Sequence, residues 1–534
     1  MPKTTKNAAN FAERKANAMY AKVNIWQART ARLCFILMCC VMPIYLNQHR
    51  YMGLPQHKWE FFVTSMVVIF LCIIAIWVYR MSRHPRLGPN MDFNIADWAL
   101  IAFAAITLLT TLISPFRELI NIWVGIPEPH GRYDGTITQL FYVAIFFIIS
   151  RWYKPRERDF MWFSIFAIAI SLIGVFQFFG MDFFRLWPQH LPEHRLENFF
   201  NLHIRTTLGN TNTVSVFVTL AILFTGFLFI RKKSKWQPLW LAASGFSFWM
   251  WDIANADSGT VGVAFALLFC IPFIIQTLKT LGRTLILAST WAGLYTLQLF
   301  FFEVVTINTR QASSLLPFAG VFAILLASGI LLSLKGKEPD PDSPPKWKLG
   351  VILIALCIIV GIVGVEILGR PDADGVGGGI LYEAREILHG NIRDEFGTNR
   401  IFIWRNALSV VPNNPLIGTG PDTFFFAFPF EAHGGIGEVG EAYDNAHNEY
   451  IHYLVTHGIL GLAAYLLFAF AIVAKSWRKA FGDPIIMATL AAFVGYLAQA
   501  FFNISHPIAS QILWVFAGIL MSRRLSDKGR FEDV

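Results

Sequence analysis

The segment "YDNAHNEYIHYLVTHGILGLAAYLLF" (residues 443–468) carries the side chains best suited to chemistry, and it runs from polar residues directly into an apolar stretch. Asp444 or Asn445 is a suitable helix N-cap, so the pattern predicts a helix that has His447 in its first turn and ends at Gly458. The positive end of a helix dipole disfavours an imidazolium. His447 is therefore expected to stay neutral and able to accept a proton from a hydroxyl nucleophile.

These histidines have two other possible roles. A histidine at a membrane boundary can simply make a structural hydrogen bond, and the residue types alone do not exclude this role. A metal site is disfavoured because His447 and His452 are five residues apart, which splays them around a helix, and there is no H-E-x-x-H motif. The six cysteines all lie within apolar runs, which argues against a disulfide or a thiol ligand. No metal, cofactor or nucleic-acid partner is therefore predicted.

A second helix is predicted upstream, in "FGTNRIFIWRNALSVVPNNPLIGTGPDTF" (residues 396–424), capped near residues 398–399 and stopped by Pro412. Arg400 and Trp404 share one face of this helix because they are four residues apart. A guanidinium can grip a phosphate through two contacts, so Arg400 is a candidate ligand for a diphosphate. The alternative is an amphipathic helix that Trp404 anchors at the lipid interface.

The elements that must position these groups are membrane helices. The 534-residue chain is 55% hydrophobic and 15% charged, and apolar runs of about 20 residues recur along it, which predicts an all-α, polytopic integral membrane protein. About fourteen spans are expected: residues 33–47, 60–79, 95–114, 136–150, 160–180, 212–230, 238–253, 260–277, 284–302, 315–334, 349–368, 458–474, 484–502 and 508–522.

These spans divide the chain into five predicted parts. They are a basic cytosolic tail (1–32), membrane helices 1–11 (33–368), a long extracytoplasmic catalytic loop (369–457), membrane helices 12–14 (458–522) and a cytosolic tail (523–534). Most of the 44 lysines and arginines fall in the segments assigned to the cytosol, which fixes this orientation. The basic residues outside are arginines except for Lys58, so the outer face is expected to handle an anion.

Four motifs follow one another on this outer face: "GRYDG" (131–135), "IRTTLGNTN" (204–212), "NRIFIWRNAL…NNPLIGTGPDTF" (399–424) and "AHNEYIHYLVTHGILGL" (446–462). Together they resemble the O-antigen ligase and polymerase superfamily of bacterial membrane glycosyltransferases, from about residue 95 onward. The resemblance implies an outward-facing active site in the bacterial cytoplasmic (inner) membrane. It also implies an undecaprenyl-diphosphate-linked glycan donor, a hydroxyl acceptor on a glycolipid, wall polymer or protein, and no metal or nucleotide sugar.

Carried over motif by motif, His447 matches the family's catalytic histidine, Arg400 its loop arginine and Arg205 the arginine before its glycine-asparagine signature. The resemblance thus implies direct displacement with inversion, in which arginines stabilise the diphosphate leaving group. Glu449 or Asp422 is expected to orient His447 or the acceptor. The full set of expected substrate-binding residues is Arg205, Arg132, Arg405, Asn448, Glu449, Trp404, Asn210 and Asp422.

Three functions fit this resemblance. A ligase moves a whole lipid-linked glycan to an acceptor, and a polymerase uses the same chemistry to extend the glycan. A transporter only binds the lipid-linked glycan, and it is disfavoured by the long outer loop and by the scarcity of ionisable residues in the middle of the spans. The sequence does not discriminate between the ligase and the polymerase.

Overall fold

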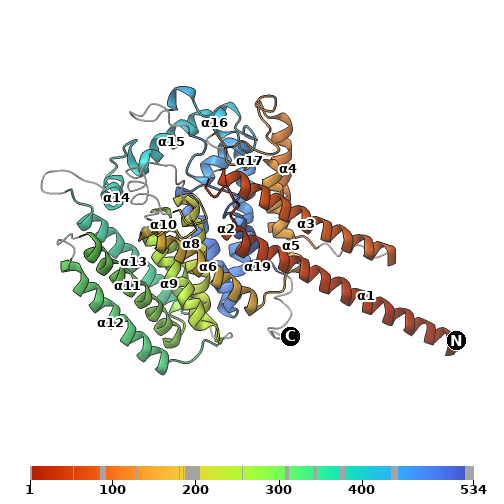
Figure 1. Cartoon of the computed structure of the whole chain (residues 1–534), viewed down its shortest axis with the longest axis horizontal. Coiled ribbons are helices and arrows are strands. Elements are labelled where there is room, and N and C mark those ends of the chain that lie inside the picture. The colour runs from red at the N-terminus through yellow and green to blue at the C-terminus, as the bar shows by residue number, and fades with distance from the viewer. Residues whose placement is uncertain are drawn as a thin grey trace.

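The structure is a computed structural model, and every element in the residues it describes is helical, which confirms the all-α prediction (Figure 1). The described residues are 3–51, 53–83, 92–127, 130–179, 181–184, 186, 205–254, 257–306, 312–340, 345–371, 379–433 and 443–522. The predicted C-terminal tail lies outside these ranges.

Each of the predicted spans overlaps a helical segment. The segments are α1 (Lys3–Phe35) with its π-helical continuation (Ile36–Val41) and α2 (Met42–Ile44), α3 (Leu54–Arg83), α4 (Ile95–Ile113), α5 (Thr136–Trp152), α6 (Glu157–Phe178), α8 (Thr211–Arg231), α9 (Gln237–Ile253), α10 (Asp257–Ile274), α11 (Leu278–Thr306), α12 (Ala312–Lys335), α13 (Trp347–Leu368), α17 (Glu449–Trp477), α18 (Pro484–Gln499) and α19 (Gln511–Leu520). Within the described ranges, nine helices are long and apolar enough to cross a membrane, and α5, α10 and α19 form shorter apolar segments. The chain is therefore a polytopic membrane protein, while the count of about fourteen spans stays a prediction.

Helix α8 forms the centre of the bundle. Its sequence is apolar all round, and it is buried along its whole length against α9, α10 and α18. Helix α13 is more apolar still, yet in it only Gly350 is buried. An apolar surface of this size is stable in lipid and costly in water, so α13 marks a lipid-facing side of the bundle.

The helices of the predicted extracytoplasmic loop gather at one end of the bundle, which we name the outer end after that prediction (Figure 1). They are α14 (Ile380–Leu388), α15 (Phe396–Val410), a 3₁₀ turn (Val411–Asn413), α16 (Phe424–Ala427) and a second 3₁₀ turn (Phe430–Ala432). A small hydrophobic core joins α15 and α16 to α17 through Ile403, Phe424 and Val455. The predicted catalytic loop is therefore a packed unit where it is described.

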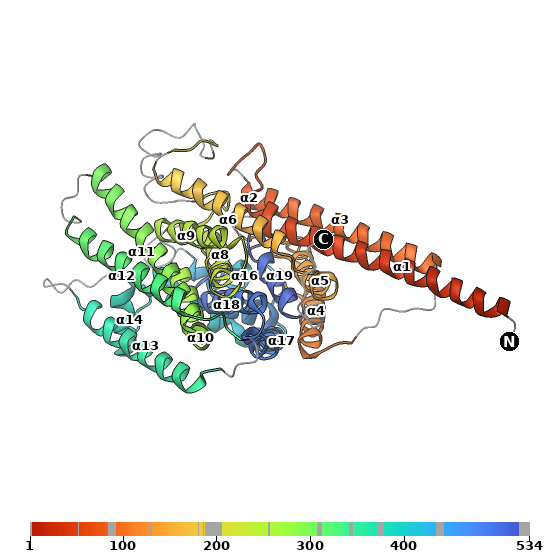
Figure 2. The same ribbon diagram turned by 90° about the horizontal axis from the view of Figure 1, so that it is seen from below.

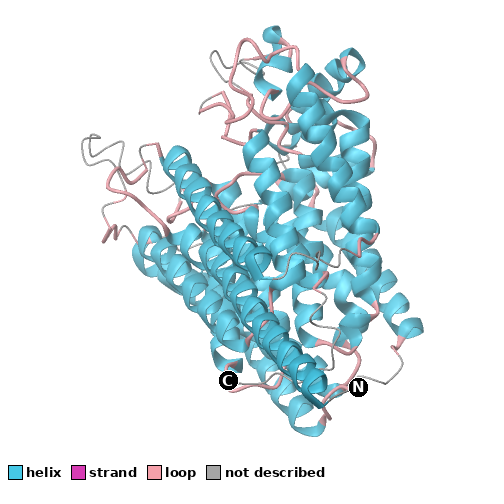
Figure 3. Ribbon diagram, turned by 90° about the vertical axis from the view of Figure 1, so that its right-hand side faces the viewer, coloured by secondary structure: helices cyan, strands magenta, loops and turns pink. Residues whose placement is uncertain are grey.

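The two ends of the described chain lie on the other side of the bundle from this outer unit (Figure 3). Helices α1 and α3 run side by side along one flank, while α11, α12 and α13 form the opposite flank (Figure 2). This arrangement agrees with the predicted topology, in which both termini share one side of the membrane.

Candidate functional site

Helix α17 begins later than predicted. Its N-cap is Asn448, whose side chain accepts hydrogen bonds from two backbone N–H groups of the first turn. Asn445 instead accepts from the His447 N–H at 3.0 Å, and His447 lies before the helix with φ of +48°. The prediction that His447 occupies the first helical turn is wrong because Asn448 outcompetes the earlier cap candidates. The predicted break at Gly458 is confirmed by its φ of +66°.

The His447 imidazole is partly buried and is influenced by two positive charges. Within the described residues its buried Nδ1 has no hydrogen-bond partner. Burial, together with the charges of Arg132 and Arg400, lowers the pKa of His447 to about 3. The expectation of a neutral imidazole therefore holds, although burial and two arginines cause it rather than a helix dipole.

Arg132 links the first of the four sequence motifs to the segment directly before the fourth. Its Nε and Nη2 donate to the two carboxylate oxygens of Asp444 at 2.7 and 3.0 Å, and both side chains are nearly buried. Two parallel, charge-assisted hydrogen bonds fix the guanidinium in one plane. The pair joins the loop before α5 to the loop that carries His447, although the partners are 312 residues apart.

Asp422, from a third segment of the chain, contacts the loop before α5 that carries Arg132. Its carboxylate accepts from the backbone N–H of Ile126 at 2.7 Å and of Arg132 at 3.2 Å. Burial raises the pKa of Asp422 to about 7, although these backbone hydrogen bonds oppose the rise. A Cβ on Gly125 or Gly131 would lie within 2.9 Å of its Oδ2, so both glycines leave room for the carboxylate. Asp422 is thus directed at the loop and not at His447.

Glu449 points into the bundle. Its carboxylate accepts from the hydroxyls of Tyr465 on α17 at 2.8 Å and Tyr496 on α18 at 2.9 Å, and it is 2% exposed. A buried carboxylate is tolerated only when hydrogen bonds replace its water. Glu449 therefore contributes to the packing of α17 against α18, and its expected role in orienting His447 or the acceptor stays a prediction.

The helix that presents Arg400 starts with an unusual turn. Gly397, Thr398 and Asn399 are all left-handed, with φ of 66°, 60° and 62°, so the right-handed helix begins at Arg400 and the predicted side-chain cap is wrong. The Arg400 Nη1 donates to the Gly397 carbonyl at 2.7 Å, and Glu383 of α14 accepts from the Gly397 N–H at 2.9 Å. Such backbone strain persists only where the surroundings hold it, and it is common at functional sites.

Helix α14 is in turn tied to the outer end of α13. The Glu366 carboxylate of α13 lies 3.3 Å from the Arg385 guanidinium and 3.0 Å from the His389 imidazole. The contacts thus run from α13 through α14 to the turn before Arg400.

The two neighbours of Arg400 on α15 have different positions. The Trp404 Nε1 donates to the Ala446 carbonyl at 2.9 Å, directly before His447, so Trp404 joins α15 to the histidine loop instead of serving only as a lipid anchor. Arg405 is exposed, and both of its terminal nitrogens pair with Asp394 at 2.9 Å. Arg405 therefore does not join His447, Arg132 and Arg400, which together form the His447 cluster.

The polypeptide crosses itself tightly beside this cluster. The N–H groups of residues 419–420 donate to the carbonyl oxygens of residues 455–456 at 3.0 and 2.8 Å, next to the break in α17. A Cβ on Gly418 would lie 2.4 Å from a backbone atom of α17, and a Cβ on Gly458 would lie 2.4 Å from the backbone of residues 416–417. The glycines of the two motifs therefore allow backbone to pack on backbone.

Arg205 and Asn210 lie on a separate outer loop. Asn210 is the N-cap of α8 and accepts from the Asn212 N–H at 2.8 Å. Arg205 lies near Tyr51, whose hydroxyl donates to the carbonyl of Thr206. Asn210 thus has a structural role, while Arg205 remains at the outer end of the bundle as a candidate ligand.

Sequence reasoning missed the role of Asp444 as the partner of Arg132. An aspartate three residues before the candidate base is a visible signal, but its distant partner is not. In the part of the chain that the structure describes, there is no group of three or more His, Cys, Asp or Glu residues that could hold a metal ion. Metal independence stays a prediction.

The fold and this cluster define a polytopic helical membrane protein that presents arginines and a neutral histidine at one end of its bundle. A family model described as O-antigen ligase matches residues 304–466, which include Arg400 and His447. Over these residues the chain is similar to the O-antigen ligase family, and the match agrees with the resemblance seen in its motifs. None of the curated proteins compared with the chain matches it.

Proposed function

We propose that the protein transfers a glycan from an undecaprenyl-diphosphate-linked donor to an acceptor hydroxyl at the outer face of the bacterial cytoplasmic membrane. The observation that carries this proposal is that the segment holding His447 is tied to both arginine segments, through the Arg132–Asp444 pair and the bond from Trp404 to Ala446, so that the charges of Arg132 and Arg400 act on the buried imidazole. The match to the O-antigen ligase model supports it, since that match covers His447 and Arg400.

In this mechanism His447 takes the proton from the acceptor hydroxyl as its oxygen attacks the anomeric carbon of the donor. The bond from that carbon to the diphosphate oxygen breaks, and the configuration inverts. Arg400, Arg132 and Arg205 stabilise the charge that develops on the diphosphate. The proton then passes from His447 to water on the outer side.

The two arginines also explain how the pKa of His447 differs between the free protein and the protein with bound donor. Their charges favour the neutral imidazole when the site is empty, together with burial. A bound diphosphate offsets these charges, so the pKa of His447 rises and the imidazole becomes a stronger base when the donor is present. The site thereby couples donor binding to acceptor activation.

The other predicted substrate-binding residues act differently in this proposal. Asn448, Glu449, Asn210 and Asp422 position backbone and helices, and Trp404 holds α15 against the histidine loop. Arg405 lies outside the site because it pairs with Asp394.

The test is transfer by the purified protein in vesicles, with a synthetic undecaprenyl-diphosphate glycan and hydroxyl acceptors. Wild type and His49→Ala, which changes an exposed histidine of the outer loop before α3, should form product. His447→Ala should form far less product, although it should still bind donor. Product length separates ligation of one glycan from stepwise extension. Transfer by His447→Ala at the wild-type rate would refute the mechanism.

A further inference from the structure

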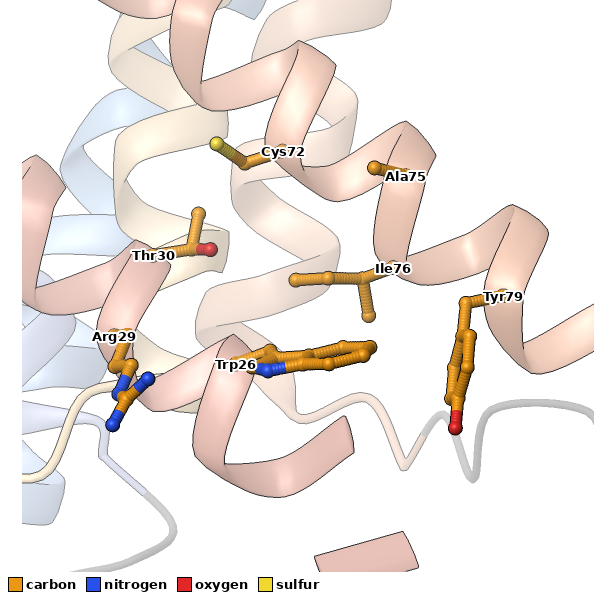
Figure 4. Close-up of a pocket in the computed structure, with 7 residues that line it drawn as sticks. All are labelled: Trp26, Arg29, Thr30, Cys72, Ala75, Ile76 and Tyr79. Atoms are coloured by element: carbon orange, nitrogen blue, oxygen red, sulfur yellow. The ribbon is translucent and has the colours of Figure 1, made fainter. Parts of the chain in front are cut away.

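A groove between α1 and α3 belongs to no part of the proposed active site. It has a volume of about 460 Å³, which is within the range of pockets that hold small ligands. It lies on the flank of the bundle that the two helices form, and Figure 4 shows side chains from both helices facing it. The lining residues are Trp26, Arg29, Thr30, Cys72, Ala75, Ile76 and Tyr79.

The lining combines an apolar surface with one charge. Cys72, Ala75 and Ile76 form the apolar wall of α3. The rings of Trp26 and Tyr79 meet edge to face with centroids 4.8 Å apart. Aromatic rings of this kind are enriched at the headgroup level of a membrane, where one part contacts hydrocarbon and another contacts water.

Arg29 is the charged residue of the groove. Its side chain is exposed, and in the described part of the chain no acidic group pairs with it. Arg32, one turn further along α1, is different because its Nε contacts Asp159 at 2.6 Å. Lys22 is also exposed, and it lies seven residues before Arg29 on the same face of α1.

The helix stretches that line the groove carry no counter-charge. Residues 19–44 and 61–83, which include all the lining residues, contain no aspartate or glutamate. Both helices also expose apolar side chains next to the groove, including Ile25 on α1 and Leu71 and Trp77 on α3. The groove therefore opens toward lipid, and the basic side chains at its rim can bind an anion.

We propose that this groove binds an acidic phospholipid of the cytoplasmic leaflet. Arg29 and Lys22 contact the phosphate, the rings of Trp26 and Tyr79 flank the glycerol region, and an acyl chain lies along Ile76. Basic pockets between membrane helices on the cytoplasmic side are suited to anionic headgroups, and each cation near the surface strengthens binding about five-fold. The inference does not depend on the glycan-transfer proposal.

The experiment uses the full-length protein reconstituted in vesicles with equal amounts of phosphatidylglycerol and phosphatidylethanolamine. Native mass spectrometry measures which lipid the protein retains, and a photoreactive phosphatidylglycerol maps the contact. Arg478→Ala is the matched control, because Arg478 is an exposed arginine at the end of α17 on the same side of the membrane and outside the groove. A size-exclusion profile confirms that each variant is folded.

Wild type and Arg478→Ala should retain phosphatidylglycerol in preference to phosphatidylethanolamine, and Arg29→Ala should retain about five-fold less of it. The photoreactive lipid should label residues 26–30 or 72–79. Equal retention of the two lipids by wild type, equal loss in the two variants, or labelling confined to other helices would overturn the proposal. Preferential retention of an added isoprenyl phosphate would also overturn it.

Discussion

Gly418→Ala tests the backbone crossing beside the candidate site. The new Cβ would lie 2.4 Å from the carbonyl carbon of Thr456 and 2.5 Å from the backbone nitrogen of His457. Backbone atoms cannot rotate away, so one of the two segments must shift. The left-handed conformation at φ of +70° costs about 1–2 kcal/mol for alanine, and the overlap adds about 1–3 kcal/mol. The expected destabilisation is about 2–5 kcal/mol.

Gly390→Ala is the matched control for this experiment. Gly390 is also left-handed, with φ of +81°, but nothing lies within 4 Å of its added Cβ. This variant should lose only the conformational part, about 1–2 kcal/mol. The assay compares thermal unfolding midpoints of the purified proteins in one detergent, together with glycan transfer. Gly418→Ala should unfold at a clearly lower temperature and lose transfer, whereas Gly390→Ala should keep transfer.

Equal midpoints for the two variants would mean that the crossing contributes nothing beyond local strain. A Gly418→Ala protein with wild-type stability and transfer would refute the geometry altogether. If Gly418→Ala does not accumulate, the same comparison is made with Gly458→Ala, whose Cβ would approach the other side of the crossing at 2.4 Å.

Four further predictions concern the chemistry. His447→Ala should reduce transfer by roughly two to four orders of magnitude while donor binding, measured separately, is retained. Because the neutral imidazole of His447 is the active form, activity should fall as the pH drops through the pKa of His447. Bound diphosphate raises that pKa from about 3, so the acid limb of kcat should lie at higher pH than the acid limb of kcat/KM. Acid limbs at the same pH would contradict the coupling of donor binding to acceptor activation. Arg400→Lys and Arg205→Lys should both lose transfer activity, because a lysine keeps the charge but cannot make two-point contacts. Full transfer in Arg400→Lys would disprove the bidentate role of Arg400. EDTA should leave turnover unchanged, and a loss that a divalent ion restores would reopen His447 as a metal ligand.

Much of the fold could be predicted because apolar runs of membrane length are a strong signal. The helices around α8 and α13 follow directly from composition. The start of α17 could not, since Asp444, Asn445 and Asn448 are all good caps and only the structure shows which one is used.

The sequence indicates which residue types belong to the candidate site, but it does not show the contacts between them. His447 and Arg400 stand out in their motifs, but the bidentate pair of Arg132 with Asp444 forms only when distant loops fold together. Glu449 shows the same dependence on distant contacts. It lies two residues from His447 in sequence, yet the tyrosines of α17 and α18 draw its carboxylate into the bundle.

The contacts that lead from α13 to Arg400 have a consequence for the membrane itself. Helix α13 is 22 residues long, or about 33 Å, close to the thickness of the hydrocarbon layer. A thicker or thinner bilayer changes the tilt of such a helix. The Glu366 ion pair would carry such a change to α14, and the Glu383 hydrogen bond would carry it to Gly397 at the start of α15. We therefore expect the position of the Arg400 guanidinium to depend on the hydrophobic thickness of the lipid around the protein.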